Sequence, residues 1–154
     1  MPVSTTELLV VDAEGQVLGR MASRVAKLLL EGNRVFIVNA EKAVISGKRN
    51  SIFREYGEFL GIKSRVQPKY TPRHGRTSEN FIRAVVRGML PRRKSKGMSA
   101  LRRLKVYAGD PGDYSKNAIK FVDANVSRLK ERYVTVEELL SRFGGNVRYQ
   151  KGGS

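Results

Sequence analysis

Residues 7–40 carry three hydrophobic patterns in succession, and this succession restricts the possible folds more than any other feature of the sequence. A short apolar run, ELLVVD (7–12), ends in a turn and predicts a buried strand. VLGRMASRVAKLLLEG (17–32) follows, with apolar residues at helical spacing and Gly32 as a stop. RVFIVNA (34–40) is short and β-branched, which favours a second strand. Together these patterns predict a βαβ unit with parallel strands and a right-handed crossover, and hence an α/β protein.

The rest of the chain shows shorter patterns of the same two kinds. SIFREYGEFL has one apolar helical face, and the helix that resumes around Ser78 is stopped by Pro91. On that second helix, Met89 is expected on the buried face. The further elements that we expect are a strand edge at 43–46, helices at 51–60, 78–90, 97–104 and 135–143, and a strand at 104–109.

Length and composition place the chain in a broad class. Its 154 residues suit one domain, and we find neither an internal repeat nor a domain boundary, so residues 1–154 are expected to form a single domain. The sequence has no cysteine, which fits a reducing compartment. It contains no apolar run of 18 residues and no N-terminal pattern of a secretory signal. These features favour a cytosolic, globular protein without a membrane partner.

Charge is the strongest functional signal. The chain has 30 Lys and Arg against 14 Asp and Glu, a net charge of +16, and residues 62–107 alone carry 14 basic residues and one acidic residue. Like charges repel and raise the free energy of a compact state, so such a concentration needs a polyanion to offset it. Nucleic acid is the favoured partner, and an anionic membrane surface is the weaker alternative.

Two stretches hold this charge. The first is a loop at 62–76 with two prolines and two nearby glycines, in which Tyr70 and His74 are candidates for stacking on unpaired bases. The second is a segment at 88–105, within GMLPRRKSKGMSALRRLKVY, that mixes basic and aliphatic residues. In it we expect Met98, Leu101 and Leu104 to anchor the chain to the core. Residues 92–96, 102 and 103 are then expected to face outward.

Catalytic and metal-binding patterns are missing. The single histidine, His74, lies among basic residues, and no cysteine or carboxylate set has ligand spacing. Asp110 and Asp113, in DPGD, favour a turn over an acid pair. Neither G-x-G-x-x-G nor a P-loop motif is present. Zinc fingers and basic helices shaped for a DNA groove are also missing, so folded RNA fits the layout better than duplex DNA.

Three blocks of the sequence resemble the L-thirteen family of large-subunit ribosomal proteins, in its archaeal-type branch. They are VVDAEGQVLGRMASRVAKLL, VFIVNAEKAVISGKR and, most specifically, VRGMLPRRKSKGMSALRRLKVYAGDP. The resemblance covers roughly residues 8–110. It implies a three-layer α/β/α fold around a small, mostly parallel central sheet, and a protein bound to large-subunit rRNA beside neighbouring ribosomal proteins in cytoplasmic ribosomes.

No catalytic residue, metal, cofactor or small-molecule substrate is implied by this family. The expected function is to bind and stabilise folded rRNA by phosphate neutralisation and to aid subunit assembly. Two alternatives remain open at this point: a non-ribosomal RNA-binding regulator of translation, and an RNA-processing enzyme that uses His74. The candidate RNA-binding residues are Lys48, Arg49, Lys63, Arg65, Lys69, Tyr70, Arg73, His74, Arg76, Arg87, Arg92, Arg93, Lys94, Lys96, Arg102, Arg103 and Lys105.

Overall fold

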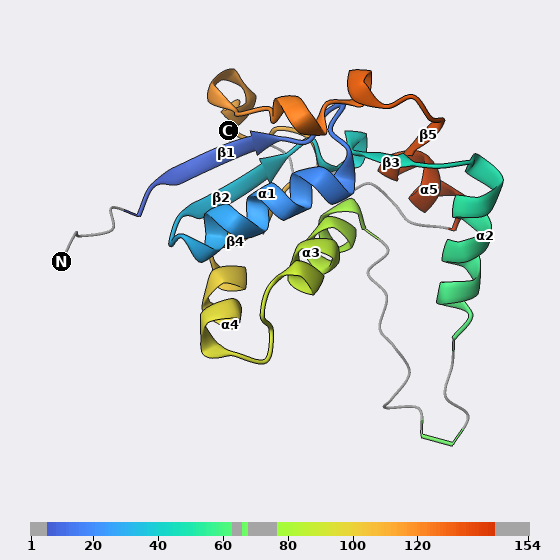
Figure 1. Ribbon diagram of the computed structural model, residues 1–154, viewed down its shortest axis with the longest axis horizontal. Coiled ribbons are helices and arrows are strands. Elements are labelled where there is room, and N and C mark those ends of the chain that lie inside the picture. The colour runs from blue at the N-terminus through green and yellow to red at the C-terminus, as the bar shows by residue number, and fades with distance from the viewer. Residues whose placement is uncertain (1–5, 63–65, 68–76, 144–154) are drawn as a thin grey trace.

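The computed structural model describes residues 6–62, 66–67 and 77–143 of the chain. The helices and strands are, in chain order, β1 (Leu8–Asp12), α1 (Leu18–Leu30), β2 (Arg34–Val38), β3 (Val44–Ser46), α2 (Arg49–Leu60), α3 (Ser78–Met89), α4 (Ser95–Arg102), β4 (Leu104–Val106), β5 (Tyr133–Thr135) and α5 (Val136–Arg142). Short 3-10 helices include η1 (Ala40–Lys42), η3 (Tyr114–Asn117), η4 (Val122–Ala124) and η5 (Val126–Arg128). Figure 1 shows β1, β2 and β4 behind α1, with α4 and α2 towards opposite ends of the molecule.

The N-terminal βαβ unit is confirmed. β1 and β2 pair in parallel, with Val10 opposite Phe36, and α1 connects them. The buried residues of α1 are Leu18, Met21, Ala22, Val25, Ala26 and Leu29. The chain leaves α1 through Gly32, which has a φ of 101°, and a residue with a side chain rarely adopts that conformation. The apolar spacing and this glycine therefore set both the face that packs and the point at which the helix ends.

The predicted strand that follows Arg103 is also present, as β4. It lies parallel to β2 on the side away from β1, which gives a sheet of order β1-β2-β4. The predicted strand edge at 43–46 is β3, but it does not join this sheet. It pairs antiparallel with β5, with Ile45 opposite Val134, so the chain returns to it about 90 residues later.

Different parts of the chain pack on the two faces of the parallel sheet. On one face, alternate side chains such as Val11, Ile37 and Leu104 are buried in the core that α1 and α3 complete. On the other face, the Phe36 ring lies edge-on to Tyr107 and to Tyr114 of η3, at centroid distances of 5.7 and 5.8 Å. The α/β class with a small, mostly parallel sheet is confirmed, and in the described residues η3 packs on the second face.

The remaining helices lie close to their predicted positions, but two methionines do not take their predicted places. Met89 is 43% exposed and Met98 is 54% exposed, although both were expected to anchor the chain. Leu90, just after α3, takes the buried place instead, at 5% exposure. On α4 the buried residues are Gly97 and Ala100. Met98 follows Gly97 by one residue, so its side chain is rotated by about 100° around the helix axis from the Gly97 position. The buried side of α4 consists of small residues because the helix packs very close to the backbone at Pro91.

Candidate nucleic-acid interface

Ten of the predicted RNA-binding residues lie in the described part of the chain. They are Lys48, Arg49, Arg87, Arg92, Arg93, Lys94, Lys96, Arg102, Arg103 and Lys105. The other seven lie outside the described residues, namely Lys63, Arg65, Lys69, Tyr70, Arg73, His74 and Arg76. The described candidates therefore come from α3, the turn that follows it, α4, β4 and the start of α2.

The most compact group is a β-turn at residues 91–94, which we call the basic turn. The Lys94 backbone N–H donates to the Pro91 carbonyl at 2.9 Å, and this bond closes the turn. Arg92 and Arg93 occupy the two central positions, and both side chains are exposed. Leu90, which is buried, ties the start of the turn to the core. The turn thus holds two guanidinium groups outward from an anchored backbone.

Gly97 fixes how α4 sits against the basic turn. A Cβ atom at this position would lie 2.2 Å from the Pro91 carbonyl oxygen and 2.5 Å from its carbon. No real Cβ contact is that short, so a side chain at Gly97 would force the turn and the helix apart. The same Pro91 carbonyl accepts the bond that closes the turn, and therefore one atom couples the turn's shape to the helix's position.

The first turn of α4 adds positive potential beside these side chains. Lys94 is the N-cap and makes no side-chain capping bond, since an ammonium group can only donate. Helix α4 also carries exposed Lys96 and Arg102. In the described residues, no basic side chain of the segment 88–105 forms an ion pair with a carboxylate. Apart from Arg103, which binds a backbone carbonyl, these cations are thus left to solvent or to a partner.

Arg103 does not face outward as predicted. Its Nη2 donates to the Leu29 carbonyl at the end of α1, at 2.6 Å, and its buried Nε has no hydrogen-bond partner. Arg83 behaves similarly, with Nη1 donating to the Leu104 carbonyl at 2.9 Å. Carbonyls at a helix C-terminus lack intrahelical donors and attract a cation, which explains why Arg103 turns inward. Of the adjacent pair, Arg102 alone remains exposed.

The remaining predicted cations are spread over the molecule. Lys105 is exposed on β4 opposite Phe36 in register, so it lies on the other face of the sheet from buried Leu104. Lys48 and Arg49 begin α2, which Figure 1 places at the opposite end of the molecule from α4. The structure therefore gathers the residues of the basic turn and α4, and it separates them from Lys48 and Arg49.

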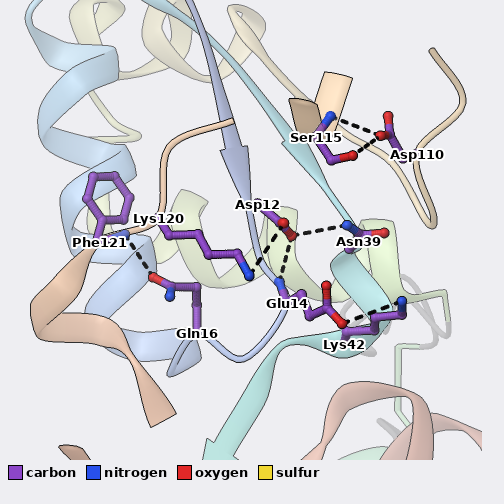
Figure 2. Close-up of polar contacts among 9 residues, drawn as sticks. All are labelled: Asp12, Glu14, Gln16, Asn39, Lys42, Asp110, Ser115, Lys120 and Phe121. Carbon is purple, nitrogen blue, oxygen red and sulfur yellow. Dashed lines mark hydrogen bonds and ion pairs between the residues drawn. The ribbon is translucent and has the colours of Figure 1, made fainter. Parts of the chain in front are cut away.

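The carboxyl ends of the parallel strands, where open α/β sheets commonly bind ligands, hold a different kind of polar group. Asp12 Oδ1 accepts bonds from the Glu14 N–H and from Asn39 Nδ2, both at 3.0 Å, and Lys120 Nζ lies 3.7 Å from Oδ2 (Figure 2). Glu41, only 1% exposed, accepts from the Gly109 N–H at 2.9 Å. These carboxylates accept hydrogen bonds from the chain's own loops and hold them in place, and we call such a carboxylate a clamp.

The DPGD sequence forms the predicted turn. Asp110 accepts a bond from the backbone N–H of Tyr114 at 2.7 Å. It also accepts bonds from the Ser115 N–H, at 2.9 Å, and from the Ser115 hydroxyl (Figure 2). Partial burial acts to raise the pKa of Asp110, but these hydrogen bonds outweigh it and hold the pKa below its ordinary value. Asp110 is therefore a turn acceptor that stabilises the start of η3.

The described residues also bear on metal and membrane partners. Within residues 6–62, 66–67 and 77–143, no group of three or more His, Cys, Asp or Glu side chains could hold a metal ion. In the same ranges, every helix is too short or too polar to cross a membrane.

Comparison with known proteins agrees with the sequence blocks. The family model described as Ribosomal protein L13 matches residues 6–113. "Large ribosomal subunit protein uL13" of Sulfurisphaera tokodaii is 47% identical over 141 residues, covering 90% of this chain and 96% of that protein. The proteins of the same name from Saccharolobus solfataricus and Aeropyrum pernix are 44% and 41% identical, covering 90% and 88% of this chain and 93% and 89% of their own lengths. These matches extend the similarity into the C-terminal third.

Proposed function

Because the chain belongs to the ribosomal protein L13 family, we propose that it is a structural constituent of the large ribosomal subunit that binds and stabilises folded rRNA. In this proposal the chain acts as a single domain in cytoplasmic ribosomes, contacts neighbouring ribosomal proteins and aids assembly of the subunit. Its residues neutralise phosphates and catalyse no reaction. The βαβ unit serves as the platform to which the basic segment is anchored.

The observation that carries this proposal is the basic turn with α4. Four exposed cations, Arg92, Arg93, Lys94 and Lys96, lie within five residues, and in the described chain no carboxylate pairs with any of them. Their backbone is held by the Pro91–Lys94 hydrogen bond and by the close approach of Gly97. An rRNA surface, dense in phosphate, offsets the repulsion among them, and a fixed backbone lowers the entropy lost on binding.

Arginine and lysine divide the work in this site. Arg92 and Arg93 offer planar forks for bidentate phosphate contacts, whereas Lys94 and Lys96 act as point charges. Exposed Arg87, Arg102 and Lys105 extend the proposed contact surface from the turn. Arg103 is better described as a residue that positions α4 on α1, since its guanidinium contacts Leu29. The seven candidate residues of the 62–76 loop stay proposals on sequence alone.

Sedimentation of cell extracts through a sucrose gradient tests the proposal. We expect the chain to travel with free large subunits and with whole ribosomes, and to remain with the large subunit when the two subunits are separated at low Mg²⁺. A crosslinking map on the purified subunit should then place residues 92–96 against rRNA. A chain that stays at the top of the gradient while other large-subunit proteins sediment would contradict a ribosomal role.

A further inference from the structure

A hollow of about 370 Å³ lies between α2 and α5, at the end of the molecule away from the basic turn. Its lining includes three arginines, Arg49 and Arg54 of α2 and Arg142 of α5. All three are exposed, and Arg142 lies more than 80 residues from the other two in the sequence. Only the packing of α5 on α2 brings them together, so the sequence gives no local sign of this cluster.

One aromatic ring organises two of these arginines. The guanidinium carbons of Arg49 and Arg142 each lie 5.0 Å from the centroid of the Phe53 ring. Phe53 itself is 7% exposed and packs near Phe143, so the ring is a fixed support. A guanidinium stacked on a ring keeps its N–H groups in its own plane, free to donate to an anion. The stack therefore restricts the side chains without occupying their donors.

The charges around the hollow favour an anion. Glu58 is the single carboxylate among the residues that line it, against three guanidinium groups. Glu138, outside the lining, forms an ion pair with Arg49 and takes up part of that charge. Arg54 and Arg142 make no ion pair within the described residues. Two arginine forks are thus left for a ligand, and bidentate contact with phosphate oxygens is what this geometry suits best.

We propose that the hollow between α2 and α5 is a second phosphate-binding site, which grips the backbone of rRNA independently of the basic turn. This inference rests on the proposed function, since it takes rRNA as the polyanion. An acidic protein segment is the competing occupant, but Phe53 is buried and offers little apolar surface for a peptide to cover. Because α2 and α4 lie at opposite ends of the molecule, two separate RNA segments or one long helix must reach both sites.

Paired substitutions test the site with a matched control. Arg54→Gln with Arg142→Gln removes the two unpaired forks, and Lys116→Gln with Lys130→Gln removes the same charge from exposed positions elsewhere. Binding of each purified variant to an rRNA fragment is measured across a range of salt concentrations. We expect the arginine pair to reduce the slope of log K against log salt by about one and a half units, since each phosphate contact adds a bit under one. The control should leave the slope close to that of the wild type.

Hydroxyl-radical footprinting on the same rRNA separates the two sites. The arginine pair should lose backbone protection at one position and keep the protection that Arg92→Ala with Arg93→Ala removes. Equal slopes for the arginine pair and its control, with an unchanged footprint, overturn the second site. The site is also overturned if the crosslinking map on the purified subunit places Arg142 against an acidic segment of a neighbouring protein while RNA binding of the arginine pair is intact. Failure of the proposed function looks different, because the wild-type chain itself then neither binds rRNA nor sediments with large subunits.

Discussion

At the end of α3, Arg92 and Arg93 stand exposed at the corners of a β-turn, whereas at the ends of the parallel strands Glu41 is buried and binds the Gly109 amide. Both regions are rich in charge. In the first, no carboxylate of the described chain neutralises the cations, and in the second, backbone N–H groups satisfy the anions. Glu41 and Glu79 thus hold a loop of the chain itself, whereas the cations of the basic turn remain available to a partner.

This division separates residues that hold the fold from residues that are free to bind, in a chain of net charge +16. The carboxylates of Glu41 and Glu79 secure residues 108 and 109, which follow β4 directly. β4 in turn continues from α4, so the anionic clamp and the basic turn lie at the two ends of one short segment. Substitutions at the clamp should therefore change stability, and substitutions at the turn should change RNA binding.

The largest expected effect on stability is at the clamp. Glu41→Ala removes a side chain that is 1% exposed and leaves the part-buried Gly109 N–H without its acceptor. We expect the free energy of unfolding to fall by about 2 to 3 kcal/mol, measured by urea denaturation. Glu131→Ala, at an exposed position, is the control and should change it by less than about 0.5 kcal/mol. A decrease in the free energy of unfolding for Glu41→Ala as small as that of the control would show that the clamp contributes little to stability.

A glycine substitution probes the geometry of the turn without altering its charge. Gly97→Ala places a Cβ against the Pro91 carbonyl, and we expect it to cost about 1 to 2 kcal/mol of stability and to weaken RNA binding. Gly88→Ala is the matched control, because a Cβ there meets nothing within 4 Å and Gly88 lies in helix α3. That change should be neutral or slightly stabilising. RNA affinity equal in both variants would show that the turn's shape is unimportant.

Two adjacent arginines, Arg102 and Arg103, allow effects on stability to be separated from effects on RNA binding. Arg103→Ala removes the bond to the Leu29 carbonyl and should cost about 1 kcal/mol of stability, with little change in the salt dependence of RNA binding. Arg102→Ala should do the reverse, leaving stability unchanged and reducing the slope by a bit under one unit. Urea denaturation and salt titration of both proteins check this, and matching behaviour of the two variants contradicts it.

The smallest expected effect concerns pH. The pKa of Asp110 is held below its ordinary value in the folded chain, so its bonds stabilise the fold above the unfolded pKa of about 3.9 and are lost as pH falls through the folded pKa. Wild type should therefore be slightly more stable than Asp110→Asn at pH 6, and the difference should shrink towards pH 2. Urea denaturation at a series of pH values measures it. A difference independent of pH would exclude a role for the ionised carboxylate.

Local patterns in the sequence predicted the five α-helices and four of the strands in the described residues, but not β5 or the 3-10 helices. The 3.6-residue spacing of Leu18, Met21 and Val25 fixed α1, and the β-branched run 35–38 fixed β2. Spacing alone placed neither methionine: Leu90 takes the buried place at the end of α3, and the close approach of Gly97 to Pro91 decides which side of α4 is buried. Contacts between elements, not periodicity, determine such faces.

The sequence predicted the candidate site only in part, because contacts between distant elements also decide where some of its side chains lie. A run of charge without acidic residues identified Arg92, Arg93 and Lys94, because a solvated surface rarely concentrates one sign. Arg103 looked equivalent to Arg102, but a helix end distant in sequence turns it inward. Arg142 was missed because its relation to Phe53 depends on how α5 packs against α2. Long-range packing of this kind leaves no local signal.

If the basic turn binds rRNA through unpaired charge, its cations must contribute to the salt dependence of RNA binding. Arg92→Ala, Arg93→Ala and Lys94→Ala are combined in one variant, and Lys116→Ala, Arg128→Ala and Lys130→Ala form the control of equal charge. With an rRNA fragment as ligand, the slope of log K against log salt should become shallower by about two to three units in the first variant. The control should keep the wild-type slope. Equal slopes in the two variants would contradict the claim.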